Sequence, residues 1–110
     1  MNEIDLINKP LAQMMWTAPV SREDGTAFDA STEVGEYRIY HGSTPGDYQK
    51  QISIAGNTLY TDLDFSQLQL PMYAVMTTVD NDGRESTYSE EIQFVKKIFA
   101  PKPPTGLSAS

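Results

Sequence analysis

Apolar and polar side chains alternate along much of this chain, which is the pattern of a β-strand with one buried face. In residues 11–16, LAQMMW, the alternation places Ala12, Met14 and Trp16 on the same face. Residues 72–80, MYAVMTTVD, form an apolar run rich in β-forming residues, as expected for a central strand covered on both faces. Similar strand patterns occupy residues 36–42, 49–56, 58–65 and 90–97. Because helix patterns are scarce, the sequence predicts an all-β protein.

The alternation also predicts which side chains share a face. The hairpin predicted after residues 72–80 fixes the register of this strand. In that register Tyr73 points outward, and the inward residues are Met72, Ala74, Met76 and Thr78. A slip of one residue would reverse these faces. The other predicted sets are Tyr37 with Ile39, Ile52 with Ile54, Leu59 with Thr61, Leu63 and Phe65, and Ile92 with Phe94. Four methionines are expected to fill irregular gaps in the core: Met14, Met15, Met72 and Met76.

Turn residues separate these strands. Asp-Gly lies within the polar loop 21–32, Pro-Gly lies within 43–48, and Ala-Gly-Asn marks a short reversal at 55–57. The sequence NDGRES at 81–86 predicts a hairpin whose tip needs a positive φ at Gly83. Six short strands with turns between them predict an antiparallel β-sandwich.

Several of these segments carry a resemblance to a known family. The segments are WTAP at 16–19, EDGT at 23–26, GEYRIYHG at 35–42, STPGDY at 43–48, AVMTTVDNDGRES at 74–86 and TYSEEI at 87–92. In their order and spacing they resemble the fibronectin type III family, in its bacterial and phage variety, from about residue 11 to residue 97. The resemblance implies a seven-stranded antiparallel immunoglobulin-like sandwich over residues 1–97. Residues 4–8 would be its short first strand, and Trp16 would pack beneath the tyrosine of the third strand.

The chain departs from that family at two places. The corner that members carry before the sixth strand, Leu-x-Pro-Gly-Thr-x-Tyr, is replaced by LQLPMY at 68–73. The segment that usually opens the first strand, Pro-Pro-x-x-Leu-x-Ala, instead occurs near the C-terminus at 103–109. Residues 98–110 are therefore a Pro-rich linker that opens a following repeat, a plain tail, or a strand donated to a neighbour. Pro103, Pro104 and Leu107 are the candidate contacts in this segment.

Composition narrows the classes of partner. The chain has 110 residues, no cysteine, and 15 acidic against 8 basic residues, for a net charge of −7. One domain of this length buries enough surface to fold without disulfides. The negative charge excludes nucleic acid as an expected partner, because phosphates would be repelled.

Membrane insertion is not expected, since no apolar stretch approaches the ~20 residues of a spanning helix. The N-terminal MNEIDLINKP lacks signal-peptide features. If Met1 is the native start, the chain is kept or assembled in the cytoplasm.

Candidate chemistry is sparse. The run from Asp80 to Glu85 does not have EF-hand spacing and predicts a hairpin tip, while Glu23, Asp24 and Asp29 leave a weak joint ion site open. His41 is the only histidine and is expected as a half-exposed strand residue. The serines lie in no nucleophile elbow, so we expect no enzyme, no cofactor and no metal.

The remaining candidate is a surface. Tyr40, Tyr73 and Val75 are expected on one outer sheet face, either packed across strands or exposed as a contact patch. The expected function is a non-catalytic structural or interaction module, a spacer or decoration domain of a virion or extracellular assembly. The alternatives are a subunit that assembles with copies of itself by donating its C-terminal strand, and a carbohydrate-binding accessory module. Its expected partners are proteins, copies of itself or a surface glycan.

Overall fold

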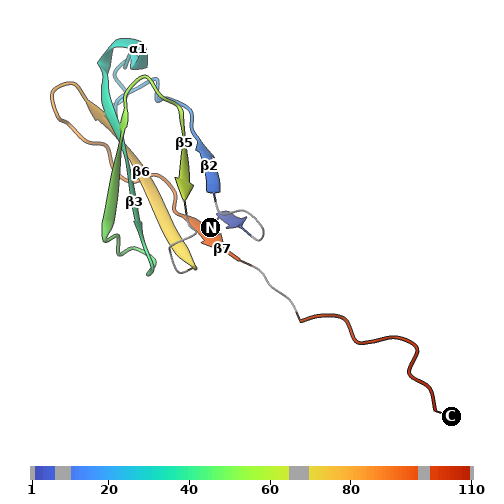
Figure 1. The fold of residues 1–110 in the computed structure, drawn as a ribbon. Helices are drawn as coiled ribbons and strands as arrows, with labels where there is room; N and C mark the ends of the chain where they lie inside the picture. Colours follow the sequence, from blue (N-terminus) through green and yellow to red (C-terminus); the bar gives the residue numbers. More distant parts are fainter. Residues whose placement is uncertain (1, 7–10, 65–69, 97–99, 110) are drawn as a thin grey trace.

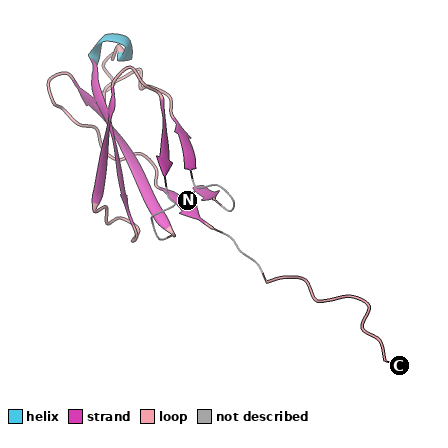
Figure 2. Cartoon of the chain, in the orientation of Figure 1, coloured by secondary structure: helices cyan, strands magenta, loops and turns pink. Residues whose placement is uncertain are grey.

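The computed structural model describes residues 2–6, 11–64, 70–96 and 100–109. Within them almost all of the regular structure is β, and strand arrows with loops between them make up the cartoon (Figure 2). In chain order the elements are β1 (Asn2–Asp5), β2 (Leu11–Met15), α1 (Ala30–Glu33), β3 (Val34–Gly42), β4 (Lys50–Ala55), β5 (Tyr60–Asp64), β6 (Met72–Asp80) and β7 (Ile92–Val95). The all-β prediction is confirmed, and β6 has the predicted bounds.

The strands form two sheets that face each other, an arrangement compatible with a β-sandwich (Figure 1). The larger sheet has the order β1-β7-β6-β3-β4, and the smaller sheet pairs β2 with β5. Strand β3 pairs with β4 on one edge and with β6 on the other. This places β3 and β6 at the centre of the larger sheet, as the apolar run of residues 72–80 predicted.

The prediction of a wholly antiparallel fold is wrong at one edge. β1 runs parallel to β7, with Asn2 opposite Ile92 and Asp5 opposite Val95. The backbone N–H of Leu6 continues this pairing by donating to the carbonyl of Val95, at 2.7 Å. A parallel partner must be distant in sequence, because it needs a long connection. The alternation within a short strand therefore predicts its buried face but not which strand it joins. The strand predicted at 4–8 is found earlier, and residues 7 and 8 lie outside the described part.

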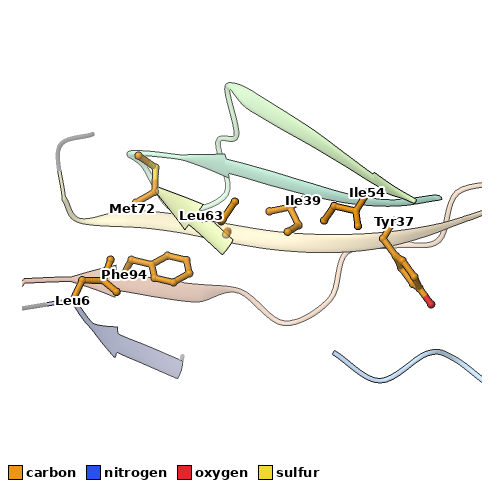
Figure 3. Packing of buried hydrophobic residues seen from close by; sticks show 8 residues of the cluster. Leu6, Tyr37, Ile39, Ile54, Leu63, Met72 and Phe94 are labelled. Atoms are coloured by element: carbon orange, nitrogen blue, oxygen red, sulfur yellow. The ribbon is translucent and has the colours of Figure 1, made fainter. Parts of the chain in front are cut away.

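The core lies between the two sheets and contains the predicted faces (Figure 3). Its fully or nearly fully buried members are Leu6, Tyr37, Ile39, Ile54, Leu63, Met72, Ala74 and Phe94. Met14, Ile52, Met76 and Ile92 are partly buried against it. Because Met72 and Ala74 point into the core with Met76 beside them, the hairpin-anchored register of β6 is confirmed.

Trp16 follows directly after β2 and packs on Tyr37 of β3. The two ring centroids are 5.4 Å apart and the ring planes meet at 62°, an edge-on contact. Such contacts between aromatic rings stabilise a core beyond the area that they bury. The predicted packing of Trp16 against the tyrosine of the third strand is confirmed, and it ties the smaller sheet to the centre of the larger one.

Two apolar predictions are wrong. Met15 is 76% exposed and Leu59 is 45% exposed. Met15 follows Met14, whose side chain packs against the core, so the two-residue period turns Met15 outward. Leu59 lies just before β5 at the end of the smaller sheet, where its carbonyl still accepts from Trp16 but its side chain is left partly in solvent. Phe65, which was predicted on the same face as Leu63, lies outside the described residues.

One short helix was not predicted. Residues 30–33 form the single turn α1, and Asp29 is its N-cap. The Asp29 side chain accepts from the backbone N–H of Ser31 at 3.0 Å, while the Glu33 carboxylate accepts from the N–H of Asp29 at 2.6 Å. This reciprocal cap is visible in the sequence as an acid that follows a capping Asp by four residues. A four-residue helix has no periodic apolar face, which is why the pattern of hydrophobic positions missed it.

Candidate functional site

The hairpin at the end of β6 is held by the buried carboxylate of Asp80. Only 6% of Asp80 is exposed. Its oxygens accept from the backbone N–H groups of Asp82 and Arg84, at 3.0 and 2.9 Å. The guanidinium groups of Arg22 and Arg84 each approach the same carboxylate to 2.9 Å. Gly83 has a φ of 86°, which confirms the predicted hairpin tip.

These contacts fix the charge of the group. The backbone N–H of Arg84 and the guanidinium of Arg22 hold the pKa of Asp80 well below its usual range. Arg22 reaches on to Glu33 at 3.3 Å and lies over the ring of Phe28, 5.0 Å from its centroid. The network therefore links β6, the loop that precedes α1, and α1 itself.

The other acids at this end are also bonded to neighbouring groups. Glu23 accepts from the backbone N–H and the hydroxyl of Thr87, at 2.7 and 2.9 Å. Asp24 accepts from both groups of Thr26 in the same way. Asp29 caps α1. Within the described residues no group of three or more metal-ligating side chains converges. The weak joint ion site left open by the sequence is therefore not formed by these acids.

A cleft of about 410 Å³ opens beside this network. Its lining includes Arg22, Glu23, Asp24, Phe28, Asp80, Arg84 and Glu85. Four of these side chains are carboxylates and two are guanidinium groups, so the cleft has an acidic excess. Since Asp80 and Glu23 are already bonded to neighbouring groups, the arrangement stabilises the loops at this end.

Three tyrosines gather on the outer face of the larger sheet. We call Tyr40, Tyr48 and Tyr88 the tyrosine cluster. The ring of Tyr88 lies 5.4 Å from that of Tyr40 and 5.5 Å from that of Tyr48. Tyr88 remains 56% exposed. The cluster thus presents one accessible aromatic ring that is positioned by two others.

Two glutamates orient the cluster. The hydroxyl of Tyr40 donates to Glu85, which also accepts from Thr77 at 2.7 Å. The hydroxyl of Tyr48 donates to Glu91. Burial and the neighbouring Glu91 raise the pKa of Tyr48 to about 12. Tyr40 and Tyr48 are therefore fixed as neutral hydrogen-bond donors at physiological pH.

The patch predicted from Tyr40, Tyr73 and Val75 is only partly present. Val75 lies opposite Tyr40 in the β3–β6 register, but it is only 4% exposed, so it is not an accessible contact. Tyr73 is half-buried, and its hydroxyl accepts from the side-chain amide of Gln93 at 3.3 Å. Instead of Tyr73 and Val75, the ring that packs on Tyr40 is that of Tyr88. It was missed because TYSEE at 87–91 has no clear strand alternation.

His41 is buried, so its prediction as a half-exposed residue is wrong. It is 7% exposed and lies between Ala74 of β6 and Lys50 of β4. Burial lowers the pKa of His41, and Lys50 lowers it further. The reason is the two-residue period of β3, since His41 lies on the same face as Tyr37 and Ile39.

The C-terminal segment is fully accessible. Residues 100–109 are exposed and form no strand or helix, and Leu107 is 100% exposed. In Figure 1 the segment leads away from the sheets. Pro103, Pro104 and Leu107 are therefore available to a partner, and their role as contacts stays a prediction.

Comparison with known proteins does not extend this picture. No family model, no characterised protein and no solved structure matches the chain. In the part of the chain that the structure describes, no helix is both long and apolar enough to cross a bilayer.

Proposed function

We propose that this protein is a non-catalytic structural or interaction module, a spacer or decoration domain within a virion or extracellular assembly. The observation that carries the proposal is its layout, in which a small β body is followed by an exposed, extended segment at 100–109. Exposed Pro-rich segments behave as semi-rigid spacers because proline restricts the backbone to extended conformations. A folded body attached to such a segment is suited to holding other parts of an assembly at a distance.

The proposed fold within the all-β class is that of fibronectin type III. Three features support it: the two facing sheets, the contact between Trp16 and Tyr37, and the hairpin with positive φ at Gly83. The parallel pairing of β1 with β7 is a departure that concerns only one edge. The proposal rests on the arrangement of these elements and carries no information about a partner.

The ionisable groups also support a structural role. A catalytic group usually has a shifted pKa and faces a site where substrate can bind. Here the lowered pKa of Asp80 comes from hydrogen bonds to Arg84 and Arg22, and the raised pKa of Tyr48 comes from burial and from Glu91, all within the domain. Asp80 holds a hairpin and Tyr48 holds an aromatic ring in place. The hydrogen bonds and ion pairs of these two groups therefore stabilise the fold.

A thermal-unfolding screen tests the proposal. A small molecule present at 100 times its dissociation constant stabilises the folded state by about 2.7 kcal/mol, which raises the midpoint of a domain this size by about 10 °C or more. We expect divalent cations, nucleotides and soluble sugars to change the midpoint by less than about 1 °C, since a spacer needs no ligand. A reproducible shift of several degrees with any of them would contradict the structural role.

The tyrosine cluster favours a second candidate, a carbohydrate-binding accessory module. Its accessible ring, Tyr88, has an apolar face and is held in position, as sugar-stacking rings require. A glycan array should then give signals that Tyr88→Ala abolishes. Tyr60→Ala is the matched control, because Tyr60 is 58% exposed on the other sheet. If the unmodified chain gives no signal on a broad array, this candidate is eliminated.

A further inference from the structure

The smaller sheet has an open edge that differs from the other sheet edges. Within the described residues β1 and β4 end the larger sheet, and β2 and β5 each pair only with the other. Natural proteins protect such edges with charged side chains, which oppose pairing with another chain. Charged residues occur in three of the four edge strands, as Glu3 and Asp5 in β1, Lys50 in β4, and Asp62 and Asp64 in β5. The remaining strand, β2, has the uncharged sequence LAQMM.

The backbone of β2 presents hydrogen-bonding groups along this edge. The N–H of Trp16 donates to the carbonyl of Leu59 at 3.2 Å, which continues the β2–β5 ladder. In an antiparallel pair, the groups of alternate residues point to opposite edges. The N–H and C=O groups of Met14 therefore point toward β5, and those of Gln13 and Met15 point away from it.

Apolar side chains surround the same edge. Met15 is 76% exposed and lies opposite Tyr60, which is 58% exposed. On the core side, Met14, Trp16 and Ile92 are only partly buried. Only residues 56–59 join β4 to β5, and this short connection keeps β5 on the β4 side of the molecule. Its partner β2 therefore lies on the β7 side. An extended segment added to β2 would cover these half-buried side chains as well as the backbone groups.

The chain itself contains a segment that fits this edge. Residues 103–110, PPTGLSAS, carry no charge, although the whole chain has a net charge of −7. A strand there would place Thr105, Leu107 and Ala109 on one face and Gly106 and Ser108 on the other. Leu107 is 100% exposed in the structure, so it has apolar surface to bury. Its face complements the half-buried Met14 and Trp16.

We propose that residues 105–109 of one copy of this chain add as a strand to the β2 edge of a second copy, with Leu107 turned toward Trp16. The prolines at 101, 103 and 104 favour a second copy over folding back, because they keep the intervening backbone extended. Addition of a strand satisfies the backbone groups of Gln13 and Met15, and packing of Leu107 on Met14 and Trp16 sets the register. Each copy carries both the donated segment and the β2 edge, so the same contact joins successive copies into a chain or two copies by reciprocal exchange. This inference deepens the structural role proposed above and rests on it.

The mass of the protein in solution tests the association. By analytical ultracentrifugation from about 10 µM to 1 mM, we expect the mean mass of the full chain to rise above that of one copy. A chain that ends at residue 100 should stay at the mass of one copy throughout. Leu107→Asp should do the same, whereas Ser108→Asp, with the same added charge on the opposite face, should still associate. A full chain that stays monomeric, or equal behaviour of the two aspartate variants, would overturn the proposal.

A disulfide cross-link tests whether residues 105–109 bind at the β2 edge. It also distinguishes binding to a second copy from folding back onto the same chain. Because the chain has no cysteine, a Gln13→Cys chain can be mixed with a Ser108→Cys chain under mild oxidation. We expect the mixed disulfide dimer to form at least ten times faster than in a control mixture in which Ser53→Cys replaces Gln13→Cys. Ser53 is an exposed position in β4. Equal rates would overturn the choice of β2. A chain carrying both Gln13→Cys and Ser108→Cys that closes within itself instead would overturn the second copy as occupant.

The failure of this inference can be distinguished from a failure of the proposed function. A monomer whose midpoint is unaffected by small ligands would exclude strand donation and leave the spacer role intact. A large ligand-induced shift would exclude the spacer role whatever the state of association.

Discussion

At the scale of single residues, Asp80 shows how one buried carboxylate organises the loops at one end of the molecule. It accepts two backbone N–H groups of its own hairpin and contacts two arginines, one of which comes from a loop 58 residues away. Removing the charge should therefore destabilise the fold more than removing a neighbouring surface charge. Asp82 offers the comparison, since its side chain is 75% exposed and contacts the guanidinium of Arg84 at 3.1 Å.

We expect Asp80→Asn to lower the urea midpoint at neutral pH, with Asp82→Asn nearly unchanged. The folded pKa of Asp80 lies below its unfolded value of about 3.9, so its contribution is present above that pH and is lost as the pH falls through the folded pKa. The difference between the unmodified chain and Asp80→Asn should therefore shrink from pH 5 toward pH 2. A difference that stays constant over this range would contradict the assignment.

His41 should impose a second pH dependence in a different window. Its folded pKa is lowered, so protonation is opposed in the folded state, and stability should fall as the pH drops below about 6.5. We expect His41→Gln to remove this slope between pH 7 and pH 5 in urea unfolding. Lys50→Gln should raise the pKa of His41, since Lys50 contributes to the shift. An imidazole that titrates at or above its ordinary pKa by NMR would show the prediction to be wrong.

At the scale of elements, β7 connects the edge strand β1 to the rest of the larger sheet. Phe94 is 0% exposed and lies opposite Ile4 of β1 and Met72 of β6. We expect Phe94→Ala to lower the free energy of unfolding by about 3–5 kcal/mol, because it leaves a cavity in the core. The matched control in β7 is Gln93→Ala, which removes one hydrogen bond to Tyr73 and should cost about 1 kcal/mol.

The same substitution should release β1 from the sheet. The amide of Leu6, which donates to Val95, should then exchange with solvent faster than the amides in β3. If hydrogen exchange at Leu6 were unchanged in Phe94→Ala, β1 would not depend on the packing of β7.

At the scale of the whole molecule, the protein is a small body with an extended appendage. The radius of gyration over all Cα atoms is 19.4 Å, with principal extents of 79, 24 and 24 Å. A compact chain of 97 residues would have a radius of gyration of about 13 Å. The difference comes from the C-terminal segment, whose described side chains from residue 100 onward are exposed.

We expect removal of residues 98–110 to reduce the radius of gyration measured by small-angle X-ray scattering at low concentration to about 13 Å. The unfolding midpoint at the same concentration should change by less than about 1 °C, because residues 100–109 are exposed and bury little surface in the folded state. A full-length monomer that already measures about 13 Å would contradict the extended segment.

Local patterns in the sequence were sufficient for most of the strands and for most of the faces that they bury. The two-residue period alone assigns Tyr37, Ile39, Ile54 and Phe94 to the core, because the geometry of an extended backbone requires that alternation. The turn at Gly83 was equally predictable, since its φ of 86° suits a residue without a Cβ. The candidate site was predicted less well: Tyr40 was identified, but Tyr88 was missed and Val75 was wrongly placed on the surface.

What the sequence by itself determined is the all-β class, the positions of most strands and the faces that they bury. Only the tertiary structure decided which strands are neighbours, because pairing joins residues that are far apart in the chain and leaves no local pattern. The parallel β1–β7 pair, the burial of His41, the ring of Tyr88 on Tyr40 and the uncharged open edge of β2 all depend on it. The same distinction applies to PPTGLSAS: its composition identifies a strand-forming segment, and only the exposed edge of β2 indicates where such a strand would bind.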